Sequence, residues 1–375
     1  MNSEIRSLFP ALDTFAYLNS AAVSPPPQPA VDAVISQLRD VSSNGSENYP
    51  LWVEKKDRAR KLVSEMLNVR PENIAFMRNT SDGIASVAAG LVWNAGDNIV
   101  SFEKEFPANY YAWRQVRDRF GVELRLCPER EGRIDLDEFI GMIDSKTRVV
   151  AISAVQYASG FRTDLERLGR AARSVGALFV VDIIQGLGAM GFDLPAQYVD
   201  VAAGASHKWL CAPEGCGIVY VSDRARNMLE PAFVGWISVE TPWDFADLEQ
   251  PFRPNALAWE SGTGPSSLFY GLEASLNIIS EVGLAKIDKY LLGLSDQVCD
   301  ASRRKGYTIV SSRVPGEASA IVSIKSARGV DAADLYRDLR DVGVIVSARG
   351  DRLRISPHFF NIESDIERFV EALPE

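Results

Sequence analysis

The stretch "LFVVDIIQGLGAM", residues 178–190, opens with an apolar run that reaches a carboxylate at Asp182. A run that is apolar on both faces is typical of a strand in a parallel sheet covered by helices on both sides. Asp182 then lies at the carboxyl end of the strand. Open α/β sheets bind their ligands at that edge, so this residue is a candidate for a binding site.

Six further runs rich in Val, Ile and Phe occur between about residues 60 and 225, at 73–77, 98–103, 123–128, 149–155, 199–205 and 217–222. Amphipathic stretches separate them. One of these, "DLERLGRAARSVG" at 164–176, ends in a glycine suited to a helix C-cap. Strands that alternate with helices in this way predict a layered α/β domain.

The pattern changes after about residue 225. Residues 234–265 form a long aromatic and proline-bearing segment, which we interpret as an irregular connection with a function rather than a linker. A long helical pattern spans roughly 266–305. Strand-like runs at 320–325 and 344–348 then alternate with helical patterns at 331–343 and near 362–373. The sequence therefore predicts a compact α+β second domain.

Bulk properties exclude several classes of protein. A length of 375 residues favours two domains. The net charge of −10 argues against a nucleic-acid partner. No apolar run reaches the roughly 20 residues of a membrane span, and the first residues lack the pattern of a secretory signal. Four cysteines are too sparse for a disulfide scaffold, so we expect a cytoplasmic protein.

Two candidate sites near strand ends have both an ordinary structural interpretation and a chemical one. Asp182 is either a structural hydrogen-bond acceptor or the partner of a protonated ring nitrogen. In "NTSDGI", Thr80, Ser81 and Gly83 open a helix. Hydroxyl groups and free N–H groups at a helix N-terminus suit a phosphate, although Ser and Thr are also the ordinary N-cap residues. Neither candidate site, taken alone, shows whether its role is structural or chemical.

Two cations raise the same question. Lys208 in "GASHKWLCAPEGCG" is either a lysine at a loop edge or a partly buried Schiff-base nucleophile. Arg354 alternates with apolar neighbours in a short strand, and such a frame suits a bidentate clamp on a carboxylate. The chain has two histidines, His207 and His358, so we expect no histidine-based metal cluster.

Taken together, these four candidate sites (Asp182, the helix start at 80–83, Lys208 and Arg354) match the needs of one cofactor. An acid for a ring nitrogen, a phosphate cradle, a Schiff-base lysine and a carboxylate clamp are the parts that an enzyme dependent on pyridoxal 5′-phosphate (PLP) requires. The sequence therefore predicts a PLP enzyme that acts at the Cα of a small amino-acid substrate.

An ordered series of motifs strengthens this prediction: "YLNSAAVSPPP", "NTSDGI", "EFPANYYAW", "AVQYASGFRTDL", "VVDIIQ", "SHKWLCAPEGCG", "WESGTGP" and "RISPHFFN". The series covers nearly the whole chain and resembles the class V aminotransferases, which include cysteine desulfurases, selenocysteine lyases and isopenicillin-N-epimerase-like proteins. The resemblance implies PLP fold type I, with a mainly parallel seven-stranded sheet in a large domain and a smaller α+β C-terminal domain. The expected limits are an N-terminal arm at 1–20, a large domain at 21–255 and a small domain at 256–375.

The resemblance also implies roles for individual residues. Lys208 would bind the cofactor's aldehyde and move protons, Asp182 would bind the pyridinium nitrogen and Gln185 the phenolic oxygen. Arg354 would hold the substrate carboxylate. The implied phosphate ligands are Thr80, Ser81, Ser206, His207 and, from the second subunit of a homodimer, Thr263. The implied lining of the substrate pocket adds Asn19 and Ala21.

Two departures from the family bear on the reaction. Phe106 stands where many relatives carry a histidine stacked on the cofactor; an aromatic ring still stacks there, but it relays no protons. The stretch 342–356 also lacks the loop cysteine of cysteine desulfurases. An aminotransferase is therefore the simplest expectation. The alternatives are a racemase or epimerase, a C–S or C–Se lyase without the loop cysteine, and a non-catalytic scaffold.

Overall fold

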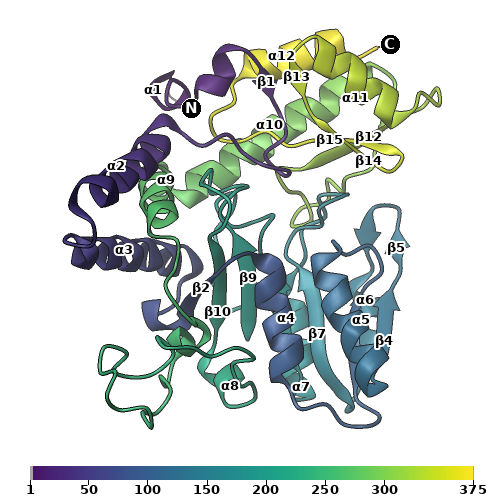
Figure 1. The fold of residues 1–375 in the computed structure, drawn as a ribbon. Coiled ribbons are helices and arrows are strands. Elements are labelled where there is room, and N and C mark those ends of the chain that lie inside the picture. The colour runs from purple at the N-terminus through teal and green to yellow at the C-terminus, as the bar shows by residue number, and fades with distance from the viewer. Residues whose placement is uncertain (1–2, 375) are drawn as a thin grey trace.

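The computed structural model describes residues 3–374, so residues 1, 2 and 375, at the outer ends of the expected arm and small domain, lie outside the described part. Seven strands form the large sheet in the order β2-β10-β9-β8-β7-β3-β4 (Figure 1). Their bounds are β2 (Ile74–Met77), β3 (Asn98–Phe102), β4 (Glu123–Cys127), β7 (Thr147–Ser153), β8 (Leu178–Asp182), β9 (Val201–Ala205) and β10 (Gly217–Val221).

Most neighbouring strands of this sheet are parallel. Only β10 runs against its neighbours β2 and β9. β10 follows β9 through the connection at 206–216, which leaves and re-enters the sheet at the same edge, so the two strands are antiparallel. The prediction of a mainly parallel seven-stranded sheet in an α/β fold is confirmed.

Side chains of the central strands enter two apolar layers. In β8, Leu178 and Val180 belong to one layer, whereas Phe179 and Val181 belong to the other. Successive residues of a strand point to opposite faces, so both faces of this strand need apolar side chains. This double burial is the reason that the strand reads as a continuous apolar run in the sequence.

Helices cover both faces of the large sheet. Apolar side chains of α4 (Thr80–Gly90), α5 (Ala108–Phe120) and α8 (Asp223–Arg226) pack in one layer. Those of α3 (Tyr49–Leu67), α6 (Leu136–Gly141), α7 (Leu165–Ser174) and α9 (Ser266–Val282) pack in the other. α7 confirms the helix expected at 164–176: Asp164 caps its start, and Gly176 follows its end with a φ of 81°.

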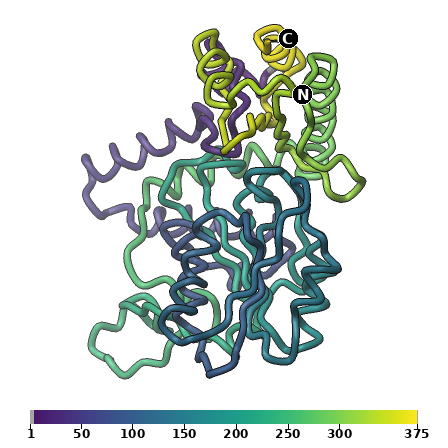
Figure 2. Tube along the Cα trace, turned by 90° about the vertical axis from the view of Figure 1, so that its right-hand side faces the viewer, coloured from purple at the N-terminus to yellow at the C-terminus, as the bar shows by residue number. Residues whose placement is uncertain are grey.

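The C-terminal part forms a second, antiparallel sheet in the order β11-β12-β15-β14. Its elements are α10 (Leu284–Arg304), β11 (Tyr307–Ile309), β12 (Val322–Ser326), α11 (Ala332–Asp341), β13 (Val344–Ile345), β14 (Ser347–Arg349), β15 (Arg352–Ile355) and α12 (Glu363–Ala372). Figure 2 shows this yellow-green region stacked over the end of the large sheet. The predicted α+β organisation is confirmed.

The beginning of the chain crosses to this second region. The N-terminal elements are α1 (Ser3–Arg6), the 3-10 helix η1 (Pro10–Asp13) and β1 (Ala16–Tyr17). β1 pairs in parallel with β13, and Ala16 and Leu18 join the apolar core of the small sheet. The chain then continues into α2 (Gln28–Asn44), which packs with α3 against α9. The residues after the arm therefore pass close to the junction of the two sheets.

The long helical pattern at 266–305 is two helices rather than one. α9 ends and α10 begins at Gly283, whose φ of 87° lies in the region that favours glycine. The apolar pattern continues on both sides of this residue, so the sequence pattern alone does not show the break. The preceding segment, 234–265, is irregular as expected, apart from the short 3-10 helix η3 (Ala256–Trp259).

Three short elements complete the fold: η2 (Pro71–Asn73), β5 (Glu129–Arg130) and β6 (Arg133–Ile134). Among residues 3–374, no helix is both long and apolar enough to cross a membrane.

Candidate active site

A cavity of about 280 Å³ lies where the large sheet meets the small domain. Asp182 ends β8, Lys208 follows β9, and Arg354 comes from β15 of the small domain. The cavity is therefore at the carboxyl edge of the parallel strands, where the sequence placed it. The lining residues are Ala21, Ala22, Asn79, Thr80, Ser81, Phe106, Ala108, Tyr157, Asp182, Ile184, Gln185, His207, Lys208, Arg349 and Arg354.

Lys208 is not a surface lysine, because its side chain lines the cavity and the residue is 8% exposed. Burial lowers its pKa, and the charges of Arg354 and Arg349 lower it further, against the opposing effect of Asp182. Its Nζ lies 5.4 Å from the centre of the Phe106 ring. A buried lysine with a lowered pKa has more of the neutral, nucleophilic amine near neutral pH than an exposed lysine has, which favours Schiff-base chemistry.

Asp182 is buried at the end of β8, and one carboxylate oxygen accepts a hydrogen bond of 2.9 Å from the N–H of Ile184. Burial raises the pKa of this carboxyl group; Glu105 adds to the rise and Lys208 opposes it. The structural hydrogen bond expected from the sequence is therefore real, and the group also lines the cavity. A buried carboxylate gains most from a cation placed beside it, which a protonated ring nitrogen supplies.

Helix α4 presents its N-terminus to the same cavity. Its N-cap is Asn79, whose side-chain oxygen accepts a hydrogen bond of 2.9 Å from the N–H of Asp82. The capping interpretation of Thr80 and Ser81 is therefore wrong. The buried hydroxyl of Thr80 has no hydrogen-bond partner among residues 3–374, and it lines the cavity with Ser81. An unpartnered hydroxyl at a helix N-terminus fits an anionic ligand such as phosphate.

Gly83 has a packing role in this helix. A Cβ at this position would lie 2.7 Å from the side chain of Val219 and 2.9 Å from that of Ala203. The absence of a side chain lets α4 approach strands β9 and β10 closely. That approach fixes the position of the helix N-terminus at the cavity.

Arg354 enters the cavity from the small domain with 1% of its surface exposed. Its Nη1 donates a hydrogen bond of 2.9 Å to the carbonyl oxygen of Tyr157, while Nε and Nη2 have no partner in the described chain. Burial lowers its pKa to about 9, with a further contribution from Arg349. Nε and Nη2 form the side-on pair of donors that binds a carboxylate in a bidentate manner.

Gln185 and Ala21 are fixed by a chain of hydrogen bonds. The Gln185 amide nitrogen donates to the carbonyl oxygen of Ala21 at 3.0 Å, and its amide oxygen accepts from the Trp209 indole at 2.9 Å. This arrangement holds the Gln185 side chain against the wall of the cavity. Phe106 lies across from Lys208, in edge contact with Tyr157 at 5.3 Å between ring centres. His207 also lines the cavity, and burial lowers the pKa of its imidazole.

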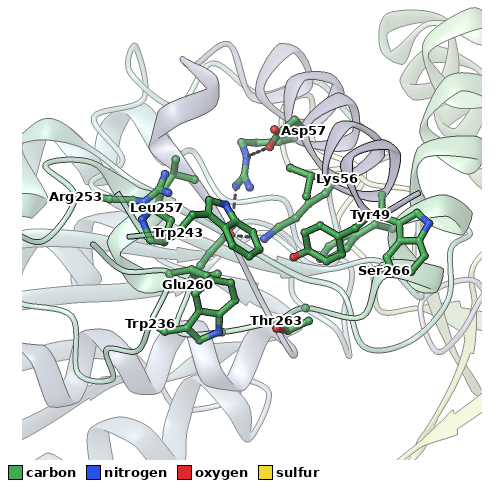
Figure 3. A pocket seen from close by; sticks show the side chains of 18 residues that line it. Tyr49, Lys56, Asp57, Trp236, Trp243, Arg253, Leu257, Glu260, Thr263 and Ser266 are labelled. Atoms are coloured by element: carbon green, nitrogen blue, oxygen red, sulfur yellow. Dashed lines mark hydrogen bonds and ion pairs between the residues drawn. The ribbon is translucent and has the colours of Figure 1, made fainter. Parts of the chain in front are cut away.

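Three residues expected at the site do not line this cavity. Asn19 accepts a 2.5 Å hydrogen bond from the Ser347 hydroxyl, and the buried Ser206 hydroxyl donates to the carbonyl oxygen of Pro213. Thr263 lies in a separate pocket with Tyr49 and the irregular segment, as Figure 3 shows. Their roles toward a cofactor or substrate stay predictions, and Thr263 was expected to act in a partner subunit.

Residues that the sequence did not single out also belong to the site. Arg349 and Tyr157 line the cavity, and Glu105 lies buried behind it, accepting hydrogen bonds from Ser153 and Gln156. Burial raises the pKa of Glu105. Glu105 lies in the motif "EFPANYYAW" and Tyr157 in "AVQYASGFRTDL", but neither residue was assigned a role of its own. Arg349 had a weaker signal, an arginine immediately before the turn at 350–351 that leads back to Arg354.

The arrangement fits PLP on observations of this chain alone. Lys208 would hold the aldehyde, Asp182 the ring nitrogen, and the unpartnered Thr80 at the start of α4 the phosphate. Phe106 supplies an aromatic face. Among residues 3–374, no group of three or more His, Cys, Asp or Glu side chains is placed to hold a metal ion.

A family model described as Aminotransferase class-V matches residues 16–367. The chain belongs to the class V aminotransferase family. Its cofactor is therefore PLP, and its fold is PLP fold type I.

Individual relatives of this class V protein are named for different activities. A probable cysteine desulfurase of Methanothermobacter thermautotrophicus is 28% identical over 99% of this chain and 97% of its own. Isopenicillin N epimerase of Amycolatopsis lactamdurans is 28% identical over 98% of this chain and 96% of its own. A solved mutant of C-DES with glycine covalently linked to its PLP cofactor has a TM-score of 0.91 and 20% identity, over 98% of each chain.

The lowered pKa of Lys208 leads to a prediction for cofactor capture by the class V apoprotein. A neutral amine attacks the aldehyde, and burial makes Lys208 lose its proton at lower pH than an exposed lysine, whose pKa is about 10.4. The rate of PLP capture should therefore rise with pH and level off well below that value. Stopped-flow absorbance of apoprotein mixed with PLP measures this profile. Nα-acetyl-lysine is the control, and an identical midpoint for both would contradict the prediction.

Proposed function

We propose that this class V enzyme acts at the Cα of an amino acid, most simply as an aminotransferase. The observation that carries the proposal is a single cavity that contains a buried lysine, a buried carboxylate and a buried arginine with two free donors. These three groups match the aldehyde and the ring nitrogen of PLP and the carboxylate of an amino acid.

The proposed chemistry divides among these residues. When bound, PLP is an electron sink for negative charge at the substrate Cα. Arg354 binds the substrate carboxylate and thereby orients the bonds at Cα. Lys208 would accept the Cα proton and, for transamination, would deliver it to C4′ of the cofactor. Asp182 keeps the proton on the ring nitrogen. Phe106 has no titratable group, so Lys208 is the proposed proton carrier at this face.

The second candidate reaction is a lyase or epimerase reaction, which the printed names of the relatives favour. Persulfide transfer through a cysteine has no support in this chain. All four cysteines, Cys127, Cys211, Cys216 and Cys299, are buried, and none is among the residues that line the cavity. Burial raises the pKa of each thiol, which disfavours the nucleophilic thiolate. Elimination without a cysteine is the form of lyase chemistry that we retain.

A homodimer is part of the proposal. Thr263 lines a separate pocket and not the cavity of its own chain, and this is the observation that supports a role for it in the site of a partner subunit. The irregular segment that contains it exposes large apolar side chains, at Val234, Trp243, Phe245, Leu248 and Phe252. Exposed apolar clusters of this kind support a protein–protein contact. A cytoplasmic location stays a prediction.

An amino-acid panel tests the reaction. The holoenzyme is incubated with single amino acids, and its absorbance, the keto acid formed, sulfide and substrate chirality are measured. Transamination should convert bound PLP to the pyridoxamine form in a single turnover, with one keto acid released per site. Release of sulfide, or loss of chirality without keto acid, would replace the aminotransferase proposal with the lyase or the epimerase.

A further inference from the structure

Arg349 is a cavity cation for which the proposed chemistry has no use. Asp182, Lys208 and Arg354 each have a partner on PLP or on the α-carboxylate of a substrate, and the start of α4 is the place for phosphate. Arg349 lines the same cavity from β14. Its Nη1 donates to the carbonyl oxygen of neighbouring Ala348 at 2.9 Å. Among the described residues it has no ion pair.

The hairpin register brings Arg349 close to Arg354. β14 and β15 are antiparallel, with Ser347 opposite Arg354 and Arg349 opposite Arg352. Residues two apart on a strand, and residues opposite each other across the pair, share a face. Arg349 and Arg354 are therefore diagonal neighbours on one face, with Cα atoms about 7–8 Å apart, a spacing that long side chains bridge.

A third arginine on this face, Arg352, differs from Arg349 and Arg354 in having a carboxylate partner. Arg352 forms an ion pair with Glu129, so its charge is balanced inside the chain. Neither Arg349 nor Arg354 has such a carboxylate within the part of the chain that the structure describes. The charge of Arg349 acts on its cavity neighbours, where it adds to burial in lowering the pKa of Arg354 and of Lys208. Two adjacent guanidinium groups without counter-ions favour a ligand with two negative groups.

We propose that Arg349 binds a second carboxylate on the substrate, so that the enzyme selects dicarboxylic amino acids such as aspartate or glutamate. Arg354 holds the α-carboxylate and Arg349 the distal one. This inference rests on the proposed function, because it assumes that Arg354 holds the α-carboxylate. It narrows the substrate class without choosing among reactions at Cα.

Unreactive diacids test the proposal without turnover. Glutarate and pentanoate have the same number of carbons, lack an amine, and differ in the second carboxylate. Calorimetric titration of the holoenzyme should show glutarate binding about tenfold or more tightly than pentanoate, because charge-assisted hydrogen bonds form at both ends. Equal affinities would overturn the proposal.

Variants of the hairpin separate binding from folding. Arg349→Gln should weaken glutarate binding about tenfold or more and leave pentanoate binding within about twofold. The matched control is Arg352→Gln, which removes an equal charge from the same hairpin and should leave the glutarate preference intact. An equal loss for both ligands in Arg349→Gln, or an equal loss of preference in Arg352→Gln, would contradict a distal carboxylate subsite.

The absorbance of the same samples distinguishes failure of the dicarboxylate subsite from failure of the proposed function. A protein that binds PLP through Lys208 but does not prefer glutarate refutes the dicarboxylate subsite alone. A protein that prefers glutarate but shows no lysine-bound PLP refutes the proposed function and leaves the two arginines as a diacid-binding pair.

Discussion

Replacement of Lys208 by alanine should abolish the absorbance band of lysine-bound PLP and lower turnover by roughly 10²–10⁴-fold or more. The side chain is proposed both to attach the cofactor and to move the Cα proton, so both functions disappear together. The absorbance spectrum of the purified protein and the rate with its best amino acid measure the two losses. PLP retained by the start of α4 alone should be removable by dialysis.

Two control variants show which property of Lys208 matters. Lys208→Arg keeps a cation, but guanidinium stays protonated and does not form the Schiff base, so it should be as inactive as alanine. Lys289→Ala removes an exposed lysine from α10 and should leave spectrum and rate unchanged. Normal absorbance and turnover in Lys208→Ala would refute the role proposed for Lys208. A parent protein that lacks both the band and turnover, and so cannot be distinguished from Lys208→Ala, would favour the non-catalytic scaffold.

The same substitution has an expected effect on stability. A charged amine held in a buried cavity is unfavourable, as its lowered pKa indicates. Its removal should therefore not reduce the free energy of unfolding of the apoprotein by more than about 1 kcal/mol. Urea unfolding of the cofactor-free proteins measures this difference. Loss of function without loss of stability is typical of an active-site residue.

The large sheet was predictable because burial on both faces forces apolar residues at successive positions. Each of the seven runs became a strand of this sheet, and Asp182 marked the ligand-binding edge. Cavity residues at this edge, such as Asp182 and Lys208, could be predicted because they lie in motifs at the ends of strands. These features depend on local sequence, so the sequence pattern predicts them.

Other features depend on contacts between distant segments. Asn79 rather than Thr80 caps α4, and this one-residue difference leaves the Thr80 hydroxyl without a partner. Arg349 and Arg352 look alike in the sequence. Only the folded hairpin shows that Arg352 meets Glu129 while Arg349 faces the cavity. The choice between an ordinary surface arginine and a binding residue therefore required the structure.

Arg354→Ala should weaken binding of α-carboxylate substrates roughly 30-fold or more, about 2 kcal/mol or more, because a buried bidentate clamp is lost. The bound-PLP spectrum should remain, since the cofactor is attached through Lys208. Titration of holoenzyme absorbance with an amino acid measures the affinity. The matching amine without a carboxylate is the control ligand, and its affinity should change little.

The free donors of Arg354 separate this clamp from a structural role. Nε and Nη2 are buried without hydrogen-bond partners among residues 3–374, so the side chain carries an unbalanced polar cost. Arg354→Ala should thus leave the free energy of unfolding within about 1 kcal/mol of the parent. Arg354→Lys keeps a cation without the planar fork and should recover only part of the affinity. Equal weakening of the amino acid and of the amine would show that Arg354 shapes the cavity instead of binding the carboxylate.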